Sequence, residues 1–216
     1  MSSLDPERAA LSQVMRELAH AGLNCGAAGN ASIRTVGGML ITPTGARARS
    51  LRDEHHVEMD LDGTIAPGQL EPSSEWRFHR DIYASRPDAH AIVHVHSPCA
   101  TALACMRREI PAFHYMISVG GGTSIRCARY ATFGTQALSD AVLEALEARR
   151  ACLLANHGLV ALGEDLAAAY ELTLALEDLA HQYLLTLQCG GPVLLAAGEM
   201  HDVLERFKTY GQQRDD

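Results

Sequence analysis

The sequence is almost without lysine. Lys208 is the only lysine in the 216 residues, and the other 17 of the 18 basic side chains are arginine. An enzyme that forms a Schiff base with its substrate needs a lysine amine. Any such mechanism in this chain would depend on one residue, which lies in the last helical segment that the sequence predicts.

Long apolar runs and paired cysteines are also missing. No uninterrupted apolar stretch reaches the roughly 18 residues of a membrane-spanning helix, and residues 1–5 lack the positive segment of a signal peptide. The six cysteines are scattered without a C-x-x-C pair, which disfavours a disulfide framework or a thiolate zinc site. We therefore expect a cytoplasmic protein that does not bind a membrane.

The charge balance and the missing motifs exclude further classes. Twenty-six acidic residues against 18 basic ones leave a net charge of -8, which would repel a polyanion, so we expect no nucleic-acid partner. The chain has no G-x-G-x-x-G, P-loop, H-E-x-x-H or G-x-S-x-G motif. The 11 histidines are the more promising source of chemistry.

Apolar spacing predicts a single α/β domain over residues 1–216. Several strands follow one another without intervening helices, which favours a mostly antiparallel central sheet, flanked by helices in three layers. No internal repeat or linker divides the chain. The main expected elements are a helix up to Gly22, short strands within 30–61, a helix capped by Ser73 or Ser74, a strand over 91–96, a hairpin over 151–162, and helices over 166–187 and 199–210.

Three histidines form a candidate metal site. His94 and His96 alternate on the predicted strand 91–96, so both side chains leave the same face of the sheet. His157 lies in the hairpin turn and is the natural third ligand. Taken singly, each could be a packing or turn residue. Four other candidate ligands are expected to be surface or packing residues: His55, His56, His90 and Cys99. Cys99 falls in a predicted helix, and His55 and His56 lie in a polar segment that is expected to be solvated.

Glu75 begins the helix after Ser73 and Ser74, where a carboxylate is ordinarily a capping residue. Hydroxyl groups and free N–H groups at a helix N-terminus can also bind an anion. Two Gly-, Asn- and Thr-containing segments, 29–32 and 42–45, offer similar groups. Three such clusters together suit a phosphate that is bound without lysine.

Seven segments, taken in order, resemble the signature of the class II (zinc-dependent) sugar-phosphate aldolase and adducin-head family, most closely its L-fuculose-1-phosphate aldolases. The segments are 29–32, 41–45, 72–75, 93–97, 114–117, 130–134 and 156–159. The resemblance implies an aldolase that cleaves a ketose 1-phosphate, such as L-fuculose 1-phosphate or a 5-deoxypentulose 1-phosphate. The products would be dihydroxyacetone phosphate and a small aldehyde. It also implies a homotetramer with active sites between subunits.

The resemblance assigns roles residue by residue. His94, His96 and His157 would hold Zn²⁺, Glu75 would be the acid/base, and Tyr115 would reach a neighbouring subunit's site to transfer a proton. The implied substrate-binding residues are Asn30, Thr44, Gly45, Ser73, Ser74 and Tyr210. Arg129 and Ala155 depart from the expected pattern and would face the aldehyde half.

The same fold leaves alternatives open. A pentulose-phosphate 4-epimerase would be expected to carry aspartate at position 75, so the glutamate favours an aldolase. A methylthioribulose-1-phosphate dehydratase would use the same metal site for loss of water. An adducin-like interaction module would be non-catalytic, and it would have no need of three histidines together with Glu75.

Overall fold

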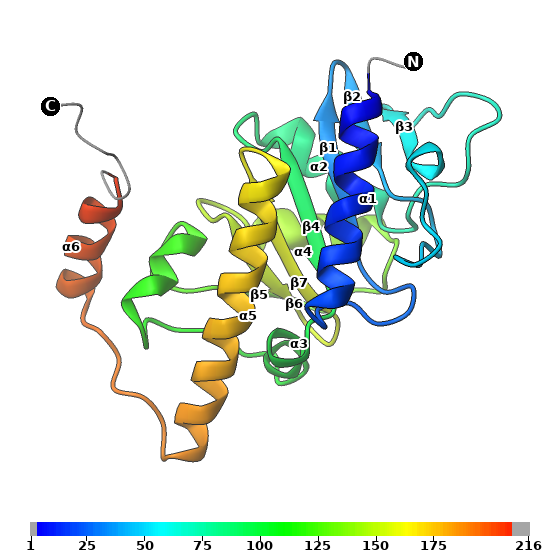
Figure 1. The fold of residues 1–216 in the computed structure, drawn as a ribbon. Helices are drawn as coiled ribbons and strands as arrows, with labels where there is room; N and C mark the ends of the chain where they lie inside the picture. The colour runs from blue at the N-terminus through cyan, green and yellow to red at the C-terminus, as the bar shows by residue number, and fades with distance from the viewer. Residues whose placement is uncertain (1–3, 209–216) are drawn as a thin grey trace, which may run out of the picture.

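The computed structural model describes residues 4–208, in which a seven-stranded sheet has helices on both faces (Figure 1). The strands run across the sheet in the order β3-β2-β1-β4-β7-β6-β5. Every adjacent pair is antiparallel except β5 and β6, which confirms the predicted mostly antiparallel sheet. The strands are β1 (Asn30–Thr35), β2 (Gly38–Ile41), β3 (Val57–Asp60), β4 (Ala91–Val95), β5 (Cys127–Ala128), β6 (Ala151–Leu154) and β7 (Gly158–Gly163).

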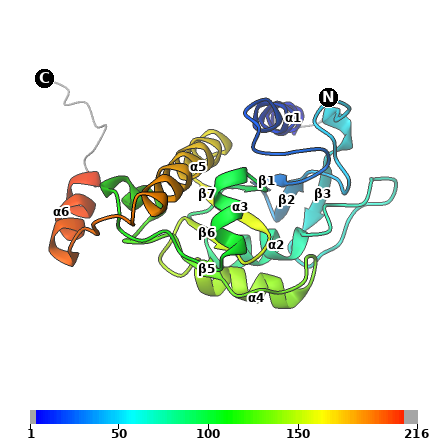
Figure 2. The same cartoon turned by 90° about the horizontal axis from the view of Figure 1, so that it is seen from below.

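The helices divide between the two faces of the sheet. Apolar side chains of α1, α3 and α5 pack on one face, and those of α2 and α4 pack on the other, so the domain has three layers (Figure 2). Among the described residues, no helix is both long and apolar enough to cross a lipid bilayer. The helices are α1 (Asp5–His20), α2 (Trp76–Ser85), α3 (Pro98–Cys105), α4 (Gln136–Ala145), α5 (Leu166–Gln188) and α6 (Ala197–Phe207), with short 3-10 turns η1 (Asp53–His55) and η2 (Tyr115–Gly120).

Strand β4 is central and fully buried. Its side chains alternate, so Val93 and Val95 face the layer of α1, α3 and α5, whereas Ile92 belongs to the core beneath α2 and α4. His94 lies on the same face as Ile92, with its ring 5.7 Å from the ring of Phe78 on α2. A histidine therefore occupies a position in the core that an apolar residue would ordinarily fill.

Two local expectations are wrong. Neither Ser73 nor Ser74 is the N-cap of α2, because the helix begins one residue later and Glu75 occupies the cap position. His56, expected to be solvated, is 2% exposed and lies 2.8 Å from the Ser12 hydroxyl through its Nε2 atom. At both positions contacts with distant parts of the chain, rather than the local sequence pattern, determine where the helix begins and whether the histidine is buried.

Candidate active site and metal centre

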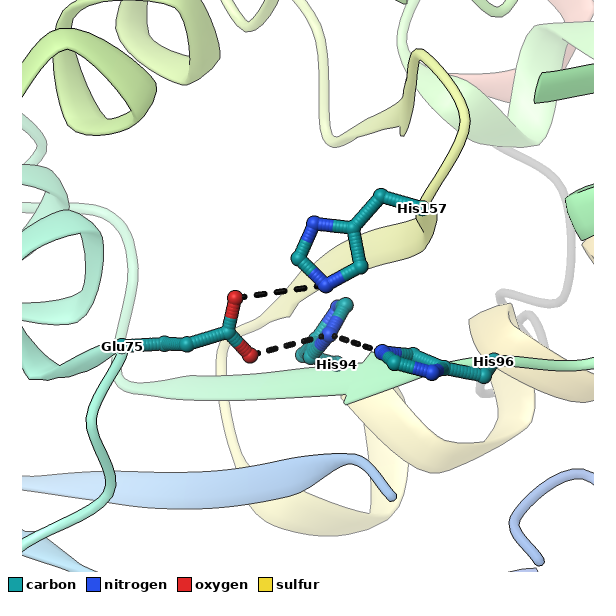
Figure 3. Close-up of side chains that lie close together, drawn as sticks. All are labelled: Glu75, His94, His96 and His157. Carbon is teal, nitrogen blue, oxygen red and sulfur yellow. Dashed lines mark hydrogen bonds and ion pairs between the residues drawn. The ribbon is translucent and has the colours of Figure 1, made fainter. Parts of the chain in front are cut away.

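The end of β4 and the β6–β7 turn bring three imidazole rings together. The ring centroids of His94, His96 and His157 lie 4.8 to 4.9 Å from one another. Glu75 completes the group, and the ligand atoms of all four residues lie within 4.8 Å of one another. Figure 3 shows the side chains pointing toward one another, His94 from β4 and His157 from the turn.

The turn that carries His157 depends on its two neighbours. Asn156 has a left-handed backbone with φ of 56°, which Asn tolerates better than most residues, and its N–H donates to the Ala104 carbonyl on α3. Gly158 packs against the end of β4, where an added Cβ would lie 2.3 Å from the Val95 carbonyl oxygen. The Asn-His-Gly sequence thus holds His157 over the β4 histidines.

The Glu75 side chain does not cap its own helix. It is 6% exposed and turns toward the histidines, with Oε2 3.2 Å from His94 Nε2 and Oε1 3.3 Å from His157 Nε2. Asn30 on β1 donates a hydrogen bond of 3.0 Å from Nδ2 to Oε2. The capping role considered for Glu75 from the sequence is therefore absent, and the carboxylate belongs to the histidine cluster.

Electrostatics keep the carboxylate ionised and two imidazoles neutral. Burial raises the pKa of Glu75, but the charge and hydrogen bond of His94, with help from His157 and Asn30, hold that pKa well below its usual range. Burial, followed by the charge of His94, lowers the pKa of His96 and of His157 to about 4 in each case. Neutral imidazoles have the lone pairs that a metal ion requires.

The donor set fits a divalent cation. His94 Nδ1 donates to the Leu159 carbonyl at 3.0 Å, which orients Nε2 toward the cluster as the atom that would bind a cation. That Nε2 lies 3.0 Å from His96 Nε2. Glu75 Oε1 is buried and has no hydrogen-bond partner, and a buried carboxylate oxygen of this kind is costly unless a positive charge lies close to it. Three imidazole nitrogens also leave coordination positions open for a substrate.

A cavity of about 310 Å³ adjoins the cluster. Glu75, His96 and His157 line it, and so do five residues to which the family resemblance gives a role in substrate binding: Asn30, Thr44, Gly45, Ser73 and Ser74. No lysine or arginine is among its lining residues within the part of the chain that the structure describes. Lys208 instead pairs with Glu205 at the end of α6, so this cavity has no Schiff-base lysine from its own described chain.

Tyr115, Arg129 and Ala155 are not among the residues that line this cavity. Tyr115 is 51% exposed on η2 and is not among the lining residues, so its action in a neighbouring subunit stays a prediction. Tyr210 lies outside the described residues. Arg129 pairs with Glu144 and Ala155 is buried, and whether they face the aldehyde half of the substrate stays a prediction.

Sequence reasoning missed three residues. Tyr130 and Phe133 line the cavity although no role was assigned to them. His79 is completely buried, and its Nε2 lies 2.6 Å from Asn30 Oδ1. The available signal for His79 was its position four residues after Glu75, which places both residues on one side of α2.

Comparison with known proteins agrees with this geometry. Residues 9–184 match the model of the class II aldolase and adducin N-terminal domain family. The chain belongs to that family. A relative from Rhodospirillum rubrum named 5-methylthioribulose-1-phosphate/5-deoxyribulose-1-phosphate aldolase is 52% identical and covers 94% of this chain and 92% of its own length. An Escherichia coli relative named L-fuculose phosphate aldolase is 51% identical, with 90% and 91% covered.

A solved structure shares the whole class II aldolase architecture. It is named L-fuculose 1-phosphate aldolase and superposes with a TM-score of 0.90 at 38% identity, covering 96% of this chain and 97% of its own. The class II aldolases of this family are metal-dependent, and the cluster of three histidines and Glu75 lies where a cation would have both ligands and access to a cavity.

Removing one histidine should remove the metal. We expect protein purified without chelator to carry about one divalent ion per chain, and His96→Ala to retain less than about a tenth of it, because an open three-ligand site depends on every ligand. Elemental analysis of the purified proteins measures both. His90→Ala changes an exposed histidine just before β4 and should keep the metal. Metal-free protein with full activity would contradict the assignment.

Proposed function

We propose that this protein is a zinc-dependent aldolase that cleaves a ketose 1-phosphate to dihydroxyacetone phosphate and a small aldehyde. The observation that carries the proposal is the position of one buried carboxylate beside three imidazoles, at the wall of a cavity lined with hydroxyl groups. These groups supply what the cleavage needs: a base, a site for a cation and a place for a phosphate.

The donor set supports zinc as the cation. Three neutral imidazoles without a thiolate are a ligand set found in catalytic zinc sites. His94, His96 and His157 would hold the ion. When bound, it would draw electrons from the substrate carbonyl and so replace the charge stabilisation that a Schiff base supplies in other aldolases.

Each remaining residue has a role in the proposal. Glu75 takes the proton from the carbon beside the carbonyl of dihydroxyacetone phosphate in the synthetic direction and returns it in cleavage. Tyr115, from a neighbouring subunit, transfers a proton at the aldehyde oxygen, and Tyr210 closes over the site. The groups that bind the phosphate and the adjoining substrate oxygens come from Asn30, Thr44, Gly45, Ser73 and Ser74, all of which line the cavity.

The assembly in this proposal is a cytoplasmic homotetramer in which residues 1–216 form one domain. Tyr115 supports a site shared between subunits, because it is half exposed and lies away from its own chain's cavity. The two apolar clusters lie on opposite faces of one sheet, which supports a single domain.

The cavity favours a substrate with a small, mostly apolar tail. Its lining includes Ala27, Ala28, Pro43, Ala131 and Phe133, and such groups bind alkyl or thioether carbon better than charged groups. The names of the two relatives fit this property, since they act on 5-methylthioribulose 1-phosphate, 5-deoxyribulose 1-phosphate or L-fuculose phosphate.

The other functions considered receive less support. An epimerase is disfavoured by glutamate at position 75, and a non-catalytic adducin-like module has no use for a buried, ionised Glu75 beside three imidazoles. A dehydratase would share the metal site, but the 52% identical relative with a methylthioribulose substrate is named an aldolase.

A panel of phosphorylated sugars tests the reaction. We expect L-fuculose 1-phosphate, 5-deoxyribulose 1-phosphate or 5-methylthioribulose 1-phosphate to release dihydroxyacetone phosphate, which is measured by coupling to its reduction. Ribulose 5-phosphate should be left unchanged. Isomerised pentulose phosphate without release would favour the epimerase, whereas loss of water from methylthioribulose 1-phosphate would favour the dehydratase.

Glu75→Gln tests the proposed base. The variant should keep its bound metal, since the three histidines remain, and should lose at least about 100-fold in the exchange of the carbon-bound proton of dihydroxyacetone phosphate with solvent, because an amide cannot accept that proton. Exchange is followed by NMR in deuterated water. Glu144→Gln, at an exposed carboxylate, should match the unmodified enzyme. Unchanged exchange in Glu75→Gln would leave Glu75 without a catalytic role.

A further inference from the structure

A line of buried polar side chains leads from Glu75 into the protein between α2 and β1. Asn30 Nδ2 lies 3.0 Å from Glu75 Oε2, and Asn30 Oδ1 lies 2.6 Å from His79 Nε2. His79 Nδ1 is 2.7 Å from the Ser32 hydroxyl, which is 2.8 Å from the Tyr83 hydroxyl. The five side chains therefore form one continuous hydrogen-bonded chain, which we call the Tyr83–Glu75 chain.

Two elements supply this chain by simple periodicity. Glu75, His79 and Tyr83 are spaced by four residues, so they lie along one side of α2 and its N-cap. Asn30 and Ser32 alternate on β1, so both point to the same face of the sheet. None of the five is more than 6% exposed. Five buried polar side chains beneath a helix take the place of apolar packing, and they are stable there only when their polar atoms are hydrogen-bonded.

The charge on Glu75 determines which group donates and which accepts in every hydrogen bond of the Tyr83–Glu75 chain. An ionised Glu75 only accepts, so the Asn30 amide must present its NH₂ group to Glu75 and its oxygen to His79. His79 then carries its proton on Nε2 and accepts at Nδ1 from the Ser32 hydroxyl. Ser32 in turn accepts from the Tyr83 hydroxyl. Burial, followed by the charge of His94, lowers the pKa of His79 to about 3, which keeps this imidazole neutral.

This hydrogen-bond pattern makes the two carboxylate oxygens of Glu75 unequal. Oε2 is engaged by Asn30, whereas Oε1 is buried without a hydrogen-bond partner and lies 3.3 Å from His157 Nε2. We propose that His79 is a positioning residue that fixes the Asn30 amide, and through it reserves Oε2 and leaves Oε1 of Glu75 as the atom that takes the substrate proton. This inference rests on the proposed aldolase function.

The same arrangement leaves room for substrate binding by Asn30. Its NH₂ group has two hydrogens, of which the bond to Glu75 uses one. The second remains available in the cavity that Asn30 lines. His79 is not among the residues that line the cavity, so its removal should impair proton transfer more than substrate binding.

His79→Leu and His79→Gln separate positioning from packing. We expect His79→Leu to lower kcat and the solvent exchange of dihydroxyacetone phosphate by about 10- to 100-fold, with KM and bound metal close to those of the unmodified enzyme. His79→Gln should recover most of the loss, because its amide N–H can again donate to Asn30 Oδ1. The control is His56→Gln, since His56 is also buried against a serine hydroxyl, that of Ser12, and this variant should keep full kcat.

Ser32→Ala tests the same inference if the larger change prevents folding. It removes the donor that fixes the His79 tautomer, so exchange should fall by several-fold, whereas Ser139→Ala, at an equally buried serine of α4, should change nothing. Normal exchange in His79→Leu or in Ser32→Ala, or equal losses in His79→Leu and His79→Gln, would overturn the inference. Absence of exchange in the unmodified enzyme would instead overturn the proposed function.

Discussion

Burial of the Glu75 carboxylate is the constraint on which the site depends. An ionised group that is 6% exposed cannot remain in a protein core without compensating partners. His94 and His157 face its two oxygens from β4 and from the β6–β7 turn, and Asn30 binds it from β1. Four separate segments of the chain must therefore be correctly folded before this charge is stable.

The sheet topology makes this convergence possible. In the order β1-β4-β7, both neighbours of β4 are antiparallel to it, so the C-terminal end of β4 lies beside the beginnings of β1 and β7. Asn30 pairs directly with His94 across one ladder, and Val95 pairs with Leu159 across the other. His94 lies within β4, His96 follows β4 directly and His157 directly precedes β7. The ends of rigid strands thus position all three ligands, an arrangement that favours a preformed site.

Much of this could be predicted from the sequence, and the failures share one cause. The alternation of side chains on a buried strand predicts that His94 and His96 share one face. The Asn-His-Gly sequence predicts that His157 lies in a turn, where it is free to point toward them. Local patterns do not show which distant segment packs on a residue, however, so the sequence predicts a solvated His56, whereas the side chain is buried against α1. The link from His79 through Asn30 to Glu75 was also missed, since its bonds join residues 45 to 49 positions apart. A residue that acts in another subunit, as proposed for Tyr115, makes contacts between chains, which patterns within one sequence do not reveal.

The most direct test of the account is anomalous diffraction at the zinc absorption edge from crystals of the metal-loaded protein. We expect one strong peak per chain, from an ion bound by one imidazole nitrogen each of His94, His96 and His157 at about 2.0 to 2.1 Å. A peak at another set of side chains, or a loaded crystal in which His157 is turned away from the ion, would contradict it.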